Sequence, residues 1–364
     1  MTRISRRTTW VAPLLAATLV IGLLASPAQA ATVATPVATG LSWPSAFTFL
    51  PDGRIIYGER FTGEIRLRNP ATGTDDLVFT IPDVAGNGEQ GLLGLALHPD
   101  YPAETGLHLY AYVTRTVNGA PVNQIWRIRI TQRNIGYRWG VIYQAPATQF
   151  HDGGRIMFGP DKQLYVVVGD AQNPANSQDL NNPFGKILRM TSVGGVPADN
   201  PFGNLIWAYG IRNSYGFTFD PETQRLWETE NGPACNDELN LVVKGANYGW
   251  GPSQTCATPP AAPLNTNRDG PNPVQPKSFY TPVIAPTGAA FCAGCGVPDL
   301  ETRLVYGTWN TRQLRLATLD ASRTVVVSDV PVYTHSAGIL SVERAPDGRI
   351  YFSDASGIYR VTAG

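Results

Sequence analysis

The chain has 364 residues, in which 28 basic side chains balance 28 acidic ones. It contains 37 glycines and 30 prolines, whereas only 15% of its residues are charged. A chain rich in turn-forming residues and poor in charge is typical of a β protein with many short strands, which excludes a helical bundle or a coiled coil. The apolar content of 43% excludes disorder, and the balanced charge gives no electrostatic basis for binding nucleic acid.

The first thirty residues have the three-part layout of a signal peptide. Three arginines precede an apolar run from Val11 to Ala25, and a small-residue cleavage motif ends at Ala30. A membrane anchor is the alternative, but the run is shorter than the ~20 residues that span a bilayer. We therefore expect residues 1–30 to be removed on export to the secreted or periplasmic space, and residues 31–364 to have no membrane span.

All four cysteines lie in the predicted mature chain, at Cys235, Cys256, Cys292 and Cys295. A zinc site is conceivable because Cys292 and Cys295 form a C-x-x-C motif, but the other two are too far apart in sequence to form a second one. An exported protein also meets an oxidising compartment. Of the three pairings that four cysteines allow, we favour the disulfides Cys235–Cys256 and Cys292–Cys295.

One local pattern recurs along the chain: an apolar strand, a turn that begins with proline, and a second strand. Proline presets the first turn dihedral, and a following Asp or Gly completes the turn. A unit near Gly288 has the strands but lacks this turn. The turns lie at Pro51-Asp52, Pro99-Asp100, Pro160-Asp161, Pro221-Glu222 and Pro346-Asp347. Six units therefore begin near residues 46, 94, 155, 216, 288 and 339.

The spacing of these units predicts a six-bladed β-propeller. Successive units begin between 48 residues apart (46 to 94) and 72 residues apart (216 to 288). A four-stranded blade needs ~40–50 residues, so the surplus would form long loops. A pair of β-sandwiches or an irregular barrel is the alternative, but the regular turns favour the propeller. We predict one all-β domain over residues 31–364, whose ring could be closed by a strand within residues 31–45.

Unusual polar residues gather in four loops next to the predicted strands, and such loops meet at one end of a propeller. His151 could act as a base near neutral pH, or it could simply bond to a turn carbonyl. Arg212, next to Asn213, could clamp a carboxylate, or it could only bond to loop carbonyls. The residues alone therefore indicate a polar mouth that carries a histidine.

Hard oxygen ligands for Ca²⁺ occur in two of these loops. Glu89, Asp237 and Glu238 offer carboxylates, and Gly232 and Pro233 offer backbone carbonyls. Turn capping and surface charge would explain the same acidic residues without a metal. The sequence contains no P-loop, dinucleotide-binding glycine motif or nucleophilic serine elbow. Residue chemistry therefore leaves open whether the mouth holds a cation.

These loops, in this order, resemble those of the soluble glucose/sorbosone dehydrogenases, the family of PQQ-dependent aldose sugar dehydrogenases. The resemblance covers nearly the whole mature chain, from about Gly40 to Thr362. A single matching motif would mean little, whereas the ordered set is specific. The matching segments are Gly91–Asp100, His151–Arg155, Phe158–Asp161, Gly169-Asp170, Gly185–Arg189, Asp199–Phe202, Tyr209–Asn213, Glu230–Asn240, Asn247–Trp250 and Ile284–Gly288.

The resemblance implies roles for individual residues. The histidine matching His151 takes the proton of the anomeric hydroxyl while hydride passes to PQQ. The arginine matching Arg212 lies near the reactive carbonyls of the cofactor, and Asn213 matches an adjacent cofactor contact. Backbone oxygens matching those of Gly232 and Pro233 hold a Ca²⁺ that also binds PQQ.

The chain departs from the family pattern at several cofactor positions. Glu89, with Gln90 beside it, stands where the family often has a glutamine that contacts the cofactor. Asn310 stands where well-known members have a lysine, with Arg312 two residues further on. Arg312 or Arg155 could compensate for the missing charge. Further departures are Ile211 for a histidine, Ala171 for a glutamine, and Gly338 and Leu340 for an Arg-x-Arg pair, with His335 as the nearest possible cation.

The sequence and the resemblance together predict an exported oxidoreductase that depends on PQQ and Ca²⁺. It would oxidise the anomeric carbon of an aldose sugar to the lactone and pass the electrons to an external acceptor. One alternative is a non-catalytic or PQQ-free propeller that binds a sugar or a protein. Another is a Ca²⁺-dependent lactonase, which would use Glu89, Asp237 and Glu238.

Overall fold

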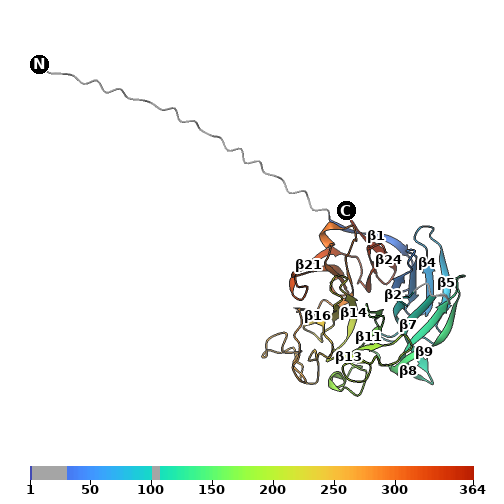
Figure 1. Ribbon diagram of the computed structural model, residues 1–364, viewed down its shortest axis with the longest axis horizontal. Coiled ribbons are helices and arrows are strands. Elements are labelled where there is room, and N and C mark those ends of the chain that lie inside the picture. Colours follow the sequence, from blue (N-terminus) through green and yellow to red (C-terminus); the bar gives the residue numbers. More distant parts are fainter. Residues whose placement is uncertain (2–30, 101–106) are drawn as a thin grey trace. The chain divides into compact units, whose positions relative to one another are not determined.

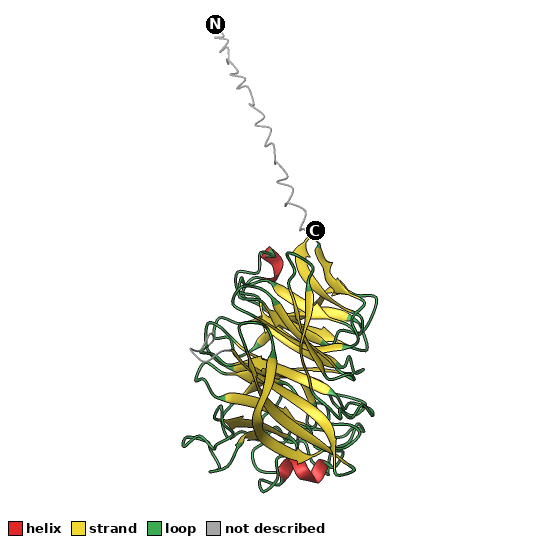
Figure 2. Ribbon diagram, turned by 90° about the vertical axis from the view of Figure 1, so that its right-hand side faces the viewer, coloured by secondary structure: helices red, strands yellow, loops and turns green. Residues whose placement is uncertain are grey.

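Six four-stranded antiparallel sheets follow one another round a ring in the computed structural model (Figure 1). The structure describes Met1, residues 31–100 and residues 107–364, and Ala31–Gly364 form one compact unit. Strands and loops make up nearly all of the described chain, and the helical segments in it are η1 (Pro174–Gln178) and η2 (Pro298–Leu300) (Figure 2). This architecture confirms the predicted six-bladed β-propeller.

The first three blades are built from β2 to β13, with four consecutive strands in each. The first blade contains β2 (Pro44–Phe49), β3 (Ile55–Glu59), β4 (Glu64–Arg68) and β5 (Asp75–Thr80). The second contains β6 (Leu92–Leu97), β7 (Leu107–Val117), β8 (Ala120–Ile130) and β9 (Gly136–Pro146). The third contains β10 (Ile156–Phe158), β11 (Leu164–Val168), β12 (Lys186–Met190) and β13 (Ile206–Tyr209).

The last three blades follow the same order, except that the sixth takes its outer strand from the start of the chain. The fourth blade contains β14 (Ser214–Phe219), β15 (Leu226–Glu230), β16 (Asp237–Val242) and β17 (Ser278–Tyr280). The fifth contains β18 (Pro286–Phe291), β19 (Leu304–Thr308), β20 (Gln313–Leu319) and β21 (Val326–Thr334). The sixth contains β22 (Ser341–Arg344), β23 (Ile350–Ser353), β24 (Gly357–Ala363) and β1 (Thr32–Thr39).

The ring is closed by antiparallel pairing of β1 with β24, in which Thr32 lies opposite Ala363 and Thr39 opposite Gly357. The expectation that residues 31–45 supply the closing strand is therefore confirmed. The predicted signal peptide, residues 1–30, lies outside the described residues except for Met1, and it stays a prediction. In the described part of the chain, no helix is both long and apolar enough to span a membrane.

The first strand of each blade lies nearest the axis, where β2 contacts β6, β6 contacts β10, β14 contacts β18, β18 contacts β22 and β22 contacts β2. These six strands begin at residues 44, 92, 156, 214, 286 and 341, each within two residues of the position predicted from the Pro-Asp pattern. Their close approach requires glycine. A Cβ at Gly216 would lie 2.0 Å from the oxygen of Thr287, and a Cβ at Gly288 would lie 2.2 Å from the nitrogen of Val342.

Both favoured disulfides are present. Cys292–Cys295 lies between β18 and β19, the connection in which the Pro-Asp turn is missing, so a covalent link tightens the turn there. Cys235–Cys256 ties the loop after β15 to the long segment before β17. The alternative of a zinc site is wrong, because all four sulfur atoms are taken up in disulfides.

The direction of the strands decides which loops meet. The Pro-Asp turns join first to second strands and therefore lie at one end of the ring. Connections from second to third strands, and from each fourth strand to the next blade, lie at the opposite end. Since the polar loops singled out in the sequence are all of these two kinds, the fold brings them to the same end of the axis.

Candidate active site

A cavity of about 390 Å³ opens at this end of the ring, where the first strands begin. It is lined by eight of the residues selected from the sequence: Glu89, His151, Arg212, Asn213, Gly232, Pro233, Asp237 and Asn310. Further lining residues that the sequence did not single out for this site include Trp43, Arg60 and Trp309. Arg155, considered only as a compensating charge, also faces it.

His151 is hydrogen-bonded to a buried carboxylate. Its Nδ1 lies 2.6 Å from Oδ1 of Asp170, and the histidine side chain keeps 16% of its surface exposed whereas Asp170 keeps 1%. A carboxylate at Nδ1 selects the tautomer in which Nδ1 carries the proton. The other ring nitrogen, Nε2, is then the unprotonated one, as a general base requires.

Asp170 is itself held in place by two further donors. The indole Nε1 of Trp250 donates to Oδ2 over 2.8 Å, and the backbone nitrogen of Gln172 donates to Oδ1 over 2.8 Å. Asp170 belongs to a motif of the sequence, but its role as partner of His151 was not predicted. The signal was its position directly after β11, which places it in a connection at the same end as His151.

The backbone at His151 adopts an unusual conformation. Its φ is +63°, a left-handed value that residues other than glycine rarely adopt and that often marks a functional site. The backbone nitrogen of His151 donates to Oε2 of Glu89 over 2.7 Å. A Cβ at Gly169 would lie 2.3 Å from the oxygen of His151, so a glycine is needed to let the two loops approach.

Arg212 reaches the cavity from the connection between β13 and β14. Its Nη1 donates to the oxygen of Asn231 over 2.8 Å, and its guanidinium lies 5.6 Å from the ring centre of Trp250. Burial lowers the pKa of Arg212 from its ordinary value, and the nearby carboxylates, Asp170 first among them, act in the opposite direction. The indole of Trp250 therefore contacts both the partner of His151 and the cavity arginine.

Asn213 is 1% exposed, and one of the two polar atoms of its side chain makes no hydrogen bond among the described residues. Its Nδ2 donates to Oε2 of Glu89 over 3.0 Å. Its Oδ1 has no hydrogen-bond partner among the described residues. A buried amide oxygen left in this way beside a cavity is suited to bind a ligand group.

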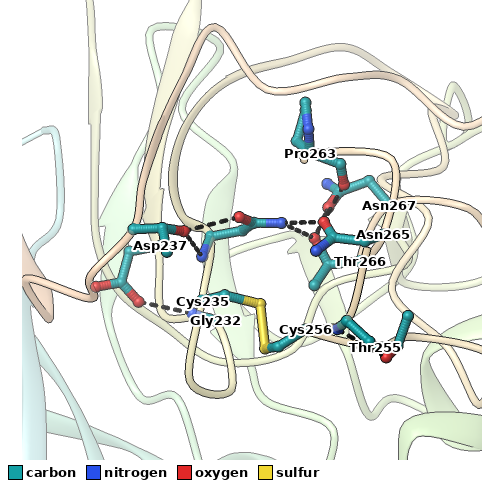
Figure 3. The surroundings of a disulfide bond; sticks show 12 residues. Gly232, Cys235, Asp237, Thr255, Cys256, Pro263, Asn265, Thr266 and Asn267 are labelled. Carbon is teal, nitrogen blue, oxygen red and sulfur yellow. Dashed lines mark hydrogen bonds between the residues drawn. A yellow bond between two sulfur atoms is a disulfide. The ribbon is translucent and has the colours of Figure 1, made fainter. Parts of the chain in front are cut away.

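Gly232 and Pro233 present their backbone to the cavity from the connection between β15 and β16. No hydrogen bond within the described chain ends on either carbonyl oxygen. Asp237 braces this loop, since its Oδ1 accepts from the nitrogen of Gly232 over 2.9 Å and its Oδ2 accepts from the nitrogens of Ile284 and Ala285. Figure 3 shows Cys235 close to Gly232, which is bonded to Asp237, so the disulfide to Cys256 fixes the same loop.

Three glutamates are buried behind this loop, on adjacent strands of the fourth blade. Glu228 is 0% exposed, Glu230 4% and Glu238 3%. Both carboxylate oxygens of Glu228 have no hydrogen-bond partner among the described residues. Burial, followed by repulsion between the carboxylates, raises the pKa of Glu228 and of Glu230, and burial raises that of Glu238.

Three residues selected from the sequence do not line the cavity, and one of them, Glu238, is among the buried glutamates described above. Gln90 is buried and links its loop to the loop after β9, with Nε2 donating to the oxygen of Thr148 over 2.7 Å. Arg312 is exposed and donates from Nη1 to the oxygen of Ser336 over 3.2 Å. His335, the nearest cation to the missing Arg-x-Arg pair, is buried with its Nε2 2.9 Å from Oδ2 of Asp354.

Two of the cavity arginines are largely engaged in holding the fold together. Arg155 donates to the backbone oxygens of Ser45, Leu93, Tyr215 and Leu340, which belong to four different blades. Arg60 donates to the oxygens of Gly88 and Gln90. Arg155 therefore does not replace the missing cationic residues at the mouth, whereas Arg60 adds one that the sequence did not reveal.

The family model described as glucose/sorbosone dehydrogenase matches residues 41–359. The chain belongs to this family. Accordingly it is an oxidoreductase of the sugar dehydrogenase class.

Relatives of known sequence and structure cover most of this family domain. An uncharacterised protein of Synechocystis is 30% identical over 87% of this chain and 82% of its own. The aldose sugar dehydrogenase YliI of Escherichia coli is 28% identical over 85% and 86%. The PQQ-bound structure of an aldose sugar dehydrogenase from Streptomyces coelicolor is 27% identical, has a TM-score of 0.79, and covers 93% of this chain and 99% of its own.

Proposed function

We propose that the protein is an exported sugar dehydrogenase that uses PQQ and Ca²⁺ to oxidise the anomeric carbon of an aldose to its lactone. The observation that carries this proposal is the His151–Asp170 pair, which faces the same cavity as Arg212 and the carbonyls of Gly232 and Pro233. A base, a cation and metal-binding oxygens are the groups that removal of a proton and a hydride from a sugar requires.

The residues present fit a calcium ion. The carbonyl oxygens of Gly232 and Pro233 carry no hydrogen bond within the described chain, and hard oxygen ligands are those that Ca²⁺ prefers. Asp237 and the disulfide hold the two carbonyls in place. Ordering these ligands before the ion binds reduces the entropy cost of binding.

The residues also fit an anionic, oxygen-rich cofactor, with a smaller set of cations than the family pattern. Arg212 and Arg60 keep guanidinium nitrogens that the bonds described above do not use. The amides of Asn213 and Asn310 add neutral polar contacts. The PQQ-bound relative from Streptomyces coelicolor shares the fold around this cavity and supports the choice of cofactor.

The chain's own residues account for the movement of the proton. Nε2 of His151 accepts the proton of the anomeric hydroxyl, and Asp170 stabilises the imidazolium that forms. Arg212 lines the same cavity and can stabilise negative charge that develops there. PQQ, held beside Ca²⁺ at the carbonyls of Gly232 and Pro233, would supply the hydride acceptor. His151 then releases its proton to solvent. An external acceptor would take up the electrons that came from the sugar.

Reconstitution tests this proposal directly. The purified protein is loaded with PQQ and Ca²⁺, and reduction of a dye is followed with a panel of aldoses. We expect turnover that disappears when either PQQ or Ca²⁺ is omitted. Absence of turnover with every sugar, together with no heat on titration with PQQ at micromolar concentration, would refute it.

A PQQ-free propeller that binds a sugar is the second candidate. It is favoured by the neutral residues Asn310, Gly338 and Leu340 at positions where the family pattern has cations. His335 does not compensate, because it is paired with Asp354. Calorimetric titration separates the two candidates, since this one predicts sugar binding without PQQ binding.

A further inference from the structure

The outer strands of the second blade carry positive charge that no neighbouring carboxylate balances. Residues 107–150 contain five arginines and no acidic residue. Arg115, near the end of β7, pairs with Asp83. No carboxylate of the described residues forms an ion pair with the other four, which are Arg127, Arg129, Arg133 and Arg138. Their charge is therefore available to an anionic partner.

Two of these arginines lie against an exposed tryptophan. The guanidiniums of Arg127 and Arg129 are 5.9 Å and 5.4 Å from the ring centre of Trp139, which is 54% exposed. Tyr137 lies opposite Arg129 in the pairing of β8 with β9 and is 55% exposed. What we call the outer patch consists of these four residues together with Arg133 and Ile135, both exposed in the turn between β8 and β9.

Strand length explains why this face of the second blade is uncovered. β8 and β9 have 11 residues each, whereas the strands of the third blade have three to five. Tyr110, on the inner part of the face, packs on Phe158 of the third blade with ring centres 5.0 Å apart. The outer part lies on the last strand of its sheet, at the rim of the ring (Figure 1). Large apolar side chains that gather in the open mark a contact surface.

The composition of the outer patch matches the surface of an anionic bilayer. Arginines are attracted to acidic headgroups and bind phosphate oxygens with two nitrogens at once. Tryptophan and tyrosine rings settle at the depth of the headgroups, because each has an apolar body and a polar edge. Asp100, at the same end of the blade, does not neutralise the patch, since its Oδ1 is bonded to Nζ of Lys162.

The position of the outer patch favours a membrane over a protein that accepts electrons. The turn between β8 and β9 joins a third strand to a fourth, so it lies at the end of the ring that carries the Pro-Asp turns. The cavity that contains His151 opens at the opposite end. An acceptor protein has to reach that cavity, whereas a membrane held at the outer patch leaves the cavity open to solution.

We propose that the outer patch docks the protein on the surface of a membrane rich in anionic phospholipid, with the mouth of the cavity facing away from the bilayer. The three arginines contact headgroup phosphates, and Ile135, Tyr137 and Trp139 enter the boundary between headgroups and acyl chains. The contact is reversible and weakens as salt is added, because it depends on few charges and few apolar side chains. It does not depend on the oxidation of any sugar.

Binding to vesicles tests the inference. The protein used is residues 31–364, which form one compact unit, so that the apolar leader does not contribute. It is mixed with vesicles of phosphatidylcholine alone, or of phosphatidylcholine with an equal amount of phosphatidylglycerol, and bound protein is recovered by flotation. We expect binding to the mixed vesicles, little binding to phosphatidylcholine alone, and a loss of more than about ten-fold in affinity at about 0.5 M salt.

Variants locate the contact. Trp139→Ala and Arg133→Glu should each lower the affinity for mixed vesicles about ten-fold. The matched controls are Phe279→Ala and Arg225→Glu, which change an exposed aromatic residue and an exposed arginine of the fourth blade and should alter the affinity less than about two-fold. Lipids with brominated chains should quench tryptophan emission of the wild type, and should quench that of Trp139→Phe less.

Three results would overturn the inference. The first is equal affinity for the two kinds of vesicle. The second is a loss of affinity as large in the fourth-blade controls as in the outer-patch variants, with the midpoint of thermal unfolding showing that all four are folded. The third is binding to soluble polyphosphate without binding to vesicles, which would make the outer patch a site for an anionic polymer.

Discussion

Replacement of Asp170 by asparagine tests the assignment of His151 as base. Asp170 accepts three hydrogen bonds, from His151 at 2.6 Å and from Trp250 and Gln172 at 2.8 Å each. Asparagine has the same shape, but it has one acceptor oxygen in place of two. Oδ1 accepts from His151 and Gln172 and Oδ2 accepts from Trp250, so the amide nitrogen must face either Trp250 alone or the other two donors together. Where it faces His151, it forces the tautomer that leaves Nε2 protonated.

The structure sets the size of the expected effect. A charge-assisted hydrogen bond contributes about 1.5–3 kcal/mol, and the wrong histidine tautomer has cost about 10⁴-fold in an enzyme with the same pairing. We expect Asp170→Asn to lower kcat by about 10²- to 10⁴-fold with little change in KM for the sugar. Trp250→Phe removes one neutral donor to the same carboxylate and should cost about ten-fold.

Two measurements check this prediction. The first is kcat and KM over a range of pH for the protein reconstituted with PQQ and Ca²⁺. The second is the ¹⁵N chemical shift of the His151 ring, which reports the tautomer without any need for turnover. An Asp170→Asn protein that keeps the wild-type kcat and the tautomer protonated at Nδ1 would refute the reasoning.

Three further predictions concern stability. Glu228→Gln should raise Tm by an amount that grows from about pH 5 to about pH 8. Burial raises the pKa of Glu228 to about 8, so the folded protein loses stability as the pH rises toward that pKa and the buried carboxyl ionises. Glutamine does not ionise, so the variant does not lose this stability. Replacing Cys235 and Cys256 together by serine should lower the free energy of unfolding, measured in urea, by about 3 kcal/mol and should also weaken Ca²⁺ binding. Lower stability with unchanged Ca²⁺ affinity would contradict the bracing of the Gly232 loop by this disulfide. Gly288→Ala should destabilise by more than about 2 kcal/mol, because its Cβ would overlap the backbone of the next blade, and a wild-type midpoint in urea would contradict the close approach of the strands.

Most of the fold could be predicted from the sequence because its signals are local. Each proline turn sits next to the strand that it ends, so the pattern located the first strands of five blades within two residues. The fifth blade was found without the turn because its strands still alternate, and the Cys292–Cys295 disulfide takes the place of the turn.

The candidate site was predicted less completely, because the residues that line the cavity come from loops that are far apart in sequence and meet only in the folded protein. Arg60 and Trp309 lie in connections from second to third strands, and nothing in their local sequence marks them as neighbours of His151. Gln90 and Arg312 illustrate the opposite error. Each is close in sequence to a residue that does reach the cavity, but adjacent residues of a loop point in different directions.

The pairing of β1 with β24 has a consequence for how the protein is made. Thr32 and Ala363 become neighbours although almost the whole chain separates them, so the last contacts to form have the largest loop-closure cost. A chain emerging from a ribosome or passing through a membrane pore cannot complete its sixth blade until its final strand is free. We therefore expect a truncation that removes β24 to block the closing of the ring.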